Sequence, residues 1–249
     1  MQHHLLRCQS FKYKRKKTSS YFFVIILNKC SKMTRTDIIN TLINKVGYKK
    51  NYLEIGLSNP ERNYFSIKCA NKECVDPFND IELGEKNINV DNIINNVLTY
   101  RMTSDEFFEM NKEIKKHYDV IFIDGLHIGS QVVKDIQNAV KWLNVGGFIV
   151  VHDCIPLNES AQSLERENRI EWNGTTWKAI PELVYVKGLS YNTVNTDYGC
   201  CVIQKLINDV NFLKYKETEL NYNEVFTNKH LRDIIMHVIS PEEFFYMYR

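Results

Sequence analysis

Two short apolar runs, each followed by acids and histidines, most constrain what this chain can fold into. Residues 120–123 and 148–151 are β-branched or aromatic without polar alternation, which is typical of strands buried on both faces of a parallel sheet. The segment between them, residues 130–143, carries apolar side chains at helical spacing. The sequence therefore predicts a β-α-β unit and, with it, an α/β fold.

Four chemically capable side chains follow these runs. Asp124 and His127 come after the first run, and His152 and Asp153 come after the second. In open α/β sheets, ligands bind beyond the carboxyl ends of the strands. Histidine changes its charge near neutral pH, so the pattern predicts a chemically active site at this edge. For His127 the alternative is a structural imidazole that bonds a loop carbonyl.

Composition sets the broad class. The chain has 249 residues, of which 44% are hydrophobic, so one α/β domain over residues 33–249 is expected. Residues 1–36 hold nine of the 32 basic residues and no acid, which leaves 23 basic against 30 acidic residues in the remainder. This acidic balance argues against a nucleic-acid-binding surface on the folded domain.

The basic extension, residues 1–32, differs from the rest of the chain. Its apolar segment, residues 21–27, is far shorter than the roughly 20 residues that span a bilayer, so no membrane span is expected. A disordered extension is the favoured interpretation; a secretory signal and an organellar presequence stay open. The seven cysteines are odd in number and lack paired CxxC spacing, which favours reduced thiols and a cytoplasmic location.

The remaining elements are predicted from periodicity and capping. Thr36 is expected to cap a first helix that ends at Lys45, and Ser104 to cap a helix over residues 105–115. Further helices are expected over residues 60–68 and 176–186, strands over 51–55, 73–77 and 96–100, and a hairpin of strands 191–195 and 198–204 at the sheet edge.

Acids also end the earlier strands. Glu54 and Gly56 mark the first strand and turn, Asp76 follows the second strand, and Ser104 with Asp105 follows the third. A carboxylate at the second strand can accept hydrogen bonds from ribose hydroxyls. A single glycine suits a nucleoside without pyrophosphate, since dinucleotide sites need more glycine. The alternatives are a surface acid for Glu54 and an ordinary turn residue for Asp76.

Seven short motifs follow one another in the chain. They are Tyr52-Leu-Glu-Ile-Gly, Val75-Asp-Pro-Phe78, Tyr100-Arg-Met-Thr-Ser-Asp-Glu-Phe-Phe108, Phe122-Ile-Asp-Gly-Leu-His127, Val151-His-Asp-Cys154, Trp172-Asn-Gly-Thr-Thr-Trp-Lys178 and Thr196-Asp-Tyr-Gly-Cys200. In this order they resemble a class I S-adenosylmethionine-dependent methyltransferase, in the small-molecule and sugar O-methyltransferase branch associated with polysaccharide biosynthesis. The resemblance implies a Rossmann-like, seven-stranded, mostly parallel sheet with helices on both faces and a reversed terminal strand.

The resemblance also implies cofactor contacts. The residues expected to contact the cofactor are Glu54, Gly56, Asp76, Ser104 and Asp105, together with Asp124 at the fourth strand. The first turn departs from the usual Glu-x-Gly-x-Gly-x-Gly, because Ser58 and Asn59 follow the single Gly56; their polar groups are expected to serve the methionine end.

Methyl transfer to a hydroxyl requires alignment of the acceptor and removal of its proton. We expect His127, His152 and Asp153 to do this work. The related O-methyltransferases hold a divalent ion at the places of Asp124 and Asp153, which predicts Mg²⁺, or Mn²⁺ because His152 is adjacent. A metal-free histidine base is the alternative.

The expected acceptor is a hydroxyl of a sugar or sugar-containing small molecule. Trp172 and Trp177 flank a polar loop and either stack on that acceptor or pack in the core. A hydroxylase-like relative and a non-catalytic binding module of the same fold are the rival functions, and a homo-oligomer stays open.

Overall fold

The computed structural model describes residues 33–57, 59–77, 96–166 and 171–249. The predicted extension, residues 1–32, and the predicted contact Ser58 lie outside the described residues.

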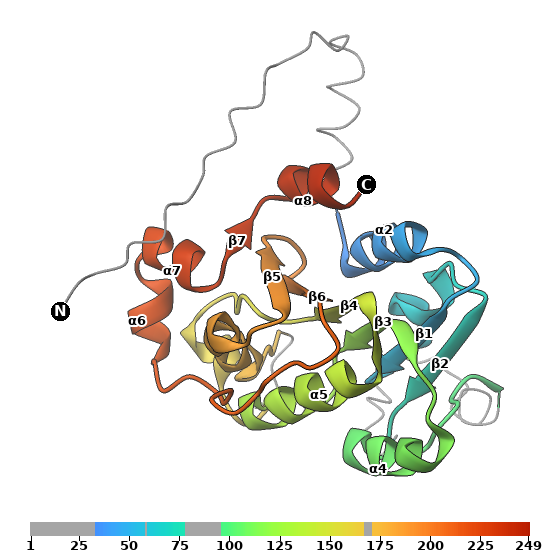
Figure 1. Ribbon diagram of the computed structural model, residues 1–249. Coiled ribbons are helices and arrows are strands. Elements are labelled where there is room, and N and C mark those ends of the chain that lie inside the picture. Colours follow the sequence, from blue (N-terminus) through green and yellow to red (C-terminus); the bar gives the residue numbers. More distant parts are fainter. Residues whose placement is uncertain (1–32, 58, 78–95, 167–170) are drawn as a thin grey trace, which may run out of the picture.

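A seven-stranded sheet forms the centre of the molecule (Figure 1). Its strands are β1 (Asn51–Ile55), β2 (Asn71–Val75), β3 (Tyr118–Ile123), β4 (Leu143–Val151), β5 (Leu189–Val194), β6 (Cys200–Lys205) and β7 (Val238–Ile239). They are ordered β2-β1-β3-β4-β6-β5-β7. β6 runs antiparallel to both β4 and β5, and the other neighbouring strands pair in parallel. The predicted fold class is confirmed.

Helices cover both faces of this sheet (Figure 1). α2 (Arg35–Val46) and α8 (Pro241–Tyr248) pack on one face, α4 (Ser104–Ile114) and α5 (Gly129–Trp142) on the other. α6 (Tyr222–Phe226) and α7 (Lys229–Ile235) follow β6, and short 3₁₀ helices occupy the connections: η1 (Pro60–Arg62), η2 (Tyr64–Ser66), η3 (Glu159–Gln162), η4 (Thr176–Ala179) and η5 (Pro181–Tyr185). None of the described helices is both long and apolar enough to cross a bilayer.

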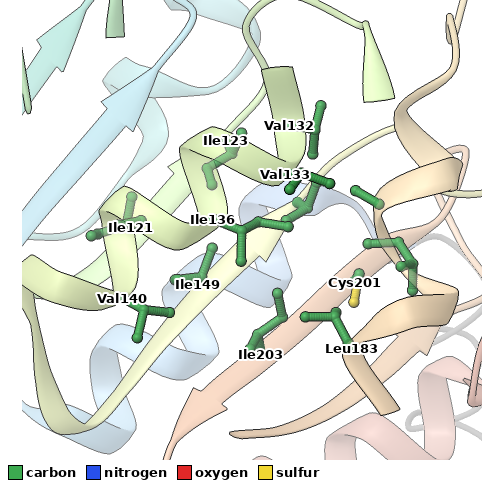
Figure 2. Packing of buried hydrophobic residues seen from close by; sticks show 14 of the residues in the cluster. Ile121, Ile123, Val132, Val133, Ile136, Val140, Ile149, Leu183, Cys201 and Ile203 are labelled. Carbon is green, nitrogen blue, oxygen red and sulfur yellow. The ribbon is translucent and has the colours of Figure 1, made fainter. Parts of the chain in front are cut away.

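The alternation of side chains along β3 divides the core into two layers. Ile121 and Ile123 belong to the layer under α5, where they meet Ile136 (Figure 2). Val120 and Phe122 belong to the layer under α2. All six residues of β3 are buried, which is why the strand shows no polar alternation.

Two helix caps differ from the prediction. Thr34, rather than Thr36, caps α2, and Thr103, rather than Ser104, caps α4. Each of the actual caps forms a reciprocal capping box with the acid three residues further on. That second hydrogen bond explains the choice of cap.

Two predicted helices are wrong. Residues 60–68 form η1 and η2, separated by Asn63 with φ −147° and ψ −63°. Residues 176–186 form η4 and η5, and Pro181 stands at the start of η5. Proline lacks the N–H group that would donate to the carbonyl four residues earlier, so an α-helix is interrupted at Pro181.

The sheet edges also differ from the prediction. Of the expected strand 96–100, only Tyr100 pairs with the sheet, in an isolated bridge with Val75. At the opposite side, β7 adds to β5, so the β5–β6 hairpin is not the edge. β7 was not predicted because a two-residue strand leaves no periodic pattern.

Ile136 offers a test of the layer between α5 and the sheet. Its side chain is fully buried, so Ile136→Ala should lower the free energy of unfolding by about 2–5 kcal/mol and Ile136→Val by about 0.5–1.5 kcal/mol. Urea unfolding measures both losses. Ile234→Ala on α7, where the side chain is 55% exposed, is the control and should change little; equal losses at both positions would contradict this packing.

Candidate active site

Parallel pairing brings three strand ends to one edge of the sheet. Ile55 of β1 pairs with Ile123 of β3, and Ile123 pairs with Val151 of β4. The next residues along the chain, Gly56, Asp124 and His152, therefore leave the sheet side by side. The predicted convergence of polar groups at the carboxyl ends is present in the structure.

Asp124 lies at the centre of this cluster. Its Oδ1 is 3.0 Å from His152 Nδ1 and 3.3 Å from His127 Nε2. Its Oδ2 accepts a hydrogen bond from Arg35 Nη1 at 3.1 Å. Burial would raise the pKa of Asp124, but the two imidazoles overcome this and hold the pKa well below its ordinary value. Asp124 is therefore a carboxylate.

Asp153 faces both imidazoles from the other side. Its Oδ2 is 3.3 Å from His127 Nδ1 and its Oδ1 is 3.4 Å from His152 Nδ1. Asn173 Nδ2 donates to Oδ1 at 2.6 Å. The backbone of Asp153 has φ 59°, a conformation that non-glycine residues seldom adopt and that is enriched at functional sites.

The segment after β4 fixes His127. The Thr175 N–H donates to the His127 carbonyl at 2.8 Å, and a Cβ on Gly174 would lie 2.0 Å from that oxygen. The Trp172 ring stacks on the imidazole, with centroids 5.0 Å apart and planes 21° apart. Trp177, in contrast, is fully buried. It therefore packs in the core, which was one of the two roles expected for it.

Sequence reasoning missed Arg35 and Asp197. Arg35 opens α2, and Asp197 lies in the turn between β5 and β6. The Arg35 backbone N–H donates to Asp197 Oδ2 at 2.8 Å, and Arg35 Nε is 3.3 Å from the same oxygen. These residues are 162 positions apart, so no local pattern links them; the Thr196–Cys200 motif was the only available signal.

Three carboxylates, two imidazoles and one guanidinium thus share the site. Burial lowers the pKa of His152, but Asp124 and Asp153 outweigh it and raise the pKa well above its ordinary value. The same balance raises the pKa of His127, where the hydrogen bond to Asp124 is the main opposing cause. Each imidazole therefore holds its proton more tightly than a free histidine does, and can accept one only in its neutral form.

The expected cofactor half begins at the turn after β1. Gly56 has φ 87°, and a Cβ there would lie 2.2 Å from the Asp124 carbonyl oxygen, so only glycine fits. The Leu57 N–H donates to Asp76 Oδ2 at 2.8 Å. Gly56 and Asp76 therefore lie together at the ends of β1 and β2.

Glu54 lies in the layer under α2, with an exposed fraction of 1%. Its Oε2 accepts hydrogen bonds from the Tyr52 hydroxyl at 2.5 Å and from Asn63 Nδ2 at 3.0 Å. It is therefore not the surface acid that the sequence left open. Its contact with a cofactor stays a prediction.

Ser104 and Asp105 open α4 and contact α5. Ser104 Oγ donates to Asp135 Oδ1 at 2.7 Å, and Asp105 Oδ2 accepts from Lys134 Nζ at 2.7 Å. Neither contact joins them to the Asp124 cluster, and their cofactor role also stays a prediction.

Comparison with known proteins bears on this edge of the sheet. Residues 68–154 match a family model described as a methyltransferase domain. That range begins just before β2 and ends at the residue after Asp153, and so includes Asp76, Asp124 and His127. The match agrees with the predicted enzyme class. No curated protein matches the chain.

Among the solved structures similar to this chain are two O-methyltransferases of low identity. One is from Bacillus cereus, in complex with SAH: identity is 14%, 76% of this chain and 92% of that chain are covered, and the TM-score is 0.46. Another is TomG from Streptomyces achromogenes, involved in tomaymycin synthesis, in complex with SAM: identity is 10%, coverage is 68% and 79%, and the TM-score is 0.48.

Glu54 gives a prediction about stability and pH. Burial is the main cause that raises its pKa from 4.5 to about 8. Between these values the folded state keeps a proton that the unfolded chain has lost, so Glu54 lowers stability increasingly as pH rises, by at most about 1.4 kcal/mol per pH unit.

Glu54→Gln keeps an acceptor for Tyr52 and cannot titrate. We measure the free energy of unfolding of both proteins in urea from pH 5 to pH 8. We expect the value for the variant minus that for the unmodified protein to increase as pH increases. A constant difference between the two proteins over this range would refute the buried, protonated Glu54.

Proposed function

We propose that this protein is an S-adenosylmethionine-dependent O-methyltransferase that acts on a hydroxyl of a sugar or sugar-containing small molecule. The observation that carries the proposal is the His127 imidazole, held between Asp124 and Asp153 at the strand ends. This cluster lies in the part of the chain that matches a methyltransferase domain. The predicted cytoplasmic location and homo-oligomer stay predictions.

The cofactor would lie over the ends of β1 and β2. S-adenosylmethionine supplies an electrophilic methyl group when bound. Asp76 would accept hydrogen bonds from the ribose hydroxyls, and the backbone at Gly56 would face the cofactor. The close approach at Gly56 and the Leu57–Asp76 hydrogen bond fit such a site, because they fix the turn beside Asp124. Ser58, Ser104 and Asp105 remain proposed contacts.

His127 is the proposed base. Asp124 Oδ1 lies 3.3 Å from Nε2 and favours a proton on that nitrogen. Nδ1, the other ring nitrogen, is buried and lies 3.3 Å from Asp153 Oδ2, but it forms no hydrogen bond with the described residues. An acceptor hydroxyl that donates to Nδ1 would lose its proton there as the methyl group is transferred. Trp172 keeps the ring plane fixed for this contact.

A divalent ion fits the two carboxylates. Ligand atoms of Asp124, His152 and Asp153 lie within 4.8 Å of one another, and carboxylate oxygens suit Mg²⁺ or Mn²⁺. Asp124 and Asp153 would hold the ion, which when bound supplies a Lewis acid for the acceptor oxygen. His152 and Arg35 contact Asp124 and orient its carboxylate for this role.

A pocket beside the cluster suits the acceptor. It has a volume of about 630 Å³ and is lined by Asp197 together with aromatic side chains and an arginine: Tyr198, Tyr222, Phe226 and Arg232. Aromatic rings and a few polar groups are typical of small-molecule sites. Asp197 also lies 3.5 Å from His152 Nε2, so the pocket adjoins the cluster. This lining is compatible with a sugar-like molecule, and Asp124, His127 and Asp153 are not among the lining residues.

Cofactor binding is the first test. S-adenosylhomocysteine should bind the protein in a calorimetric titration, and Asp76→Ala should weaken binding roughly tenfold or more through the lost hydrogen bonds. Asp209→Ala, an exposed acid beyond β6, is the control and should bind as the unmodified protein does. Absence of binding at millimolar concentration would refute the proposed function.

The role of His127 is tested by turnover on a panel of hydroxylated sugars. His127→Ala should lower kcat by roughly 10²–10⁴-fold and leave S-adenosylhomocysteine binding unchanged. Mass spectrometry of the product should show the gain of one CH₂ group. The gain of one oxygen atom would instead identify the hydroxylase-like rival, and full turnover by the variant would remove His127 from the mechanism.

A further inference from the structure

The two ring nitrogens of His152 face different groups. Nδ1 lies 3.0 Å from Asp124 Oδ1 and 3.4 Å from Asp153 Oδ1, in the cluster described above. Nε2 lies on the other side, 3.5 Å from Asp197 Oδ1. His152 is 3% exposed, and its Nε2 has no hydrogen-bond partner in the part of the chain that the structure describes.

Cys200 completes this second environment. The antiparallel ladder pairs Val151 with Cys201, so His152, the residue after β4, lies next to Cys200, the first residue of β6. Cys200 is fully buried. One ligand atom each from His152, Asp197 and Cys200 lies within 4.8 Å of the other two. A buried, unpartnered imidazole nitrogen therefore faces a carboxylate and a thiol.

We propose that His152 Nε2, Asp197 and Cys200 form a binding site for a transition-metal ion of the Zn²⁺ type. This site is separate from the proposed Mg²⁺ or Mn²⁺ position at Asp124 and Asp153, and it goes beyond the methyltransferase function. His152 would bind this ion through Nε2 and would orient Asp124 of the other site through Nδ1.

The donor set selects the metal. Nitrogen, oxygen and sulfur together suit Zn²⁺ and similar ions, whereas Mg²⁺ prefers oxygen alone. Zinc bonds of about 2.0–2.3 Å in a tetrahedron place ligand atoms roughly 3.4–3.8 Å apart. The 3.5 Å between His152 Nε2 and Asp197 Oδ1 already meets this separation. Three protein ligands leave a fourth position for water or for a group of the ligand in the adjoining pocket.

The surrounding hydrogen bonds prepare His152 for this role. A carboxylate cannot donate, so the 3.0 Å contact with Asp124 is a hydrogen bond only when Nδ1 carries the proton. A metal ion at Nε2 would displace the second ring proton, while Nδ1–H stays bonded to Asp124, the arrangement in which metal-binding histidines are usually held by a carboxylate. Arg35 Nη1, 3.0 Å from Nδ1, has Asp124 Oδ2 as its acceptor.

Arg35 orients the carboxylate ligand as well. Its backbone N–H and its Nε both contact Asp197 Oδ2, which leaves Oδ1 directed at His152 Nε2. His152 and Asp197 are thus each held by a contact of their own before an ion arrives.

Co²⁺ is the probe for this site, because a thiolate bound to Co²⁺ gives a charge-transfer band in the near ultraviolet and tetrahedral Co²⁺ gives intense visible bands. The full chain, first treated with a chelator, is titrated with CoCl₂. We expect both bands to appear, and Zn²⁺ to abolish them by displacing Co²⁺.

Variants locate the thiolate. Cys200→Ala and the closer isostere Cys200→Ser should lose the charge-transfer band, and Asp197→Ala should weaken Co²⁺ binding roughly tenfold or more. Cys201→Ala is the matched control: Cys201 is equally buried but faces the α5 layer, so its variant should keep the band. Cys8→Ser with Cys30→Ser, and Asp153→Asn, should keep it too.

Two outcomes would overturn the proposal. One is the absence of a charge-transfer band in the unmodified protein up to millimolar Co²⁺; the other is an equal band in folded Cys200→Ser. Circular dichroism confirms folding, and Asp197→Ala, at a partly exposed position, provides the test if both Cys200 variants fail to fold. None of these readouts depends on methyl transfer.

Discussion

The parallel register of β1, β3 and β4 is the constraint on which the rest of the molecule depends. It aligns Ile55, Ile123 and Val151, so the chain segments after them emerge together. Burial of β3 and most of β4 on both faces fixes that register, since a slip of one residue would exchange the two core layers. The chemistry at the edge is thus positioned by apolar packing beneath it.

Desolvation explains why the polar groups at that edge occur as a set. Asp153 and His152 are almost completely buried, and an isolated charge at such positions would be strongly unfavourable. Imidazoles and a guanidinium lie within 3.0–3.4 Å of the carboxylates and offset that cost. Removal of one partner leaves another buried charge uncompensated. Substitution of any one of these residues is therefore expected to disturb the whole cluster.

Sequence alone was sufficient for the central part of the fold. The runs that became β3 and β4, and the helix α5 between them, have strong periodicity, and the parallel arrangement then places Asp124, His127, His152 and Asp153 at one edge. Elements with weak or conflicting local signals were predicted less well. Pro181 broke an expected helix, and a two-residue strand, β7, left no pattern.

The candidate site was predictable only where it depends on strand ends. Arg35 and Asp197 meet because α2 packs beside the β5–β6 turn. No local sequence pattern near either residue predicts that contact. The orientation of Glu54 into the α2 layer, and the burial of Trp177, likewise follow from how whole elements pack. Residue type gave the chemistry of these positions; tertiary packing decided which groups they meet.

The contact between Arg35 and Asp197 has a consequence for the order of folding. Its two partners are 162 residues apart, so the contact forms only after the intervening chain has brought them together. During synthesis, α2 leaves the ribosome long before the turn that receives its first residue. The strand-end carboxylates depend on β1, β3 and β4 alone, whereas the side of the cluster that includes His152 Nε2 also needs the β5–β6 hairpin in the sheet. Completion of this centre therefore requires the β5–β6 turn to be in place.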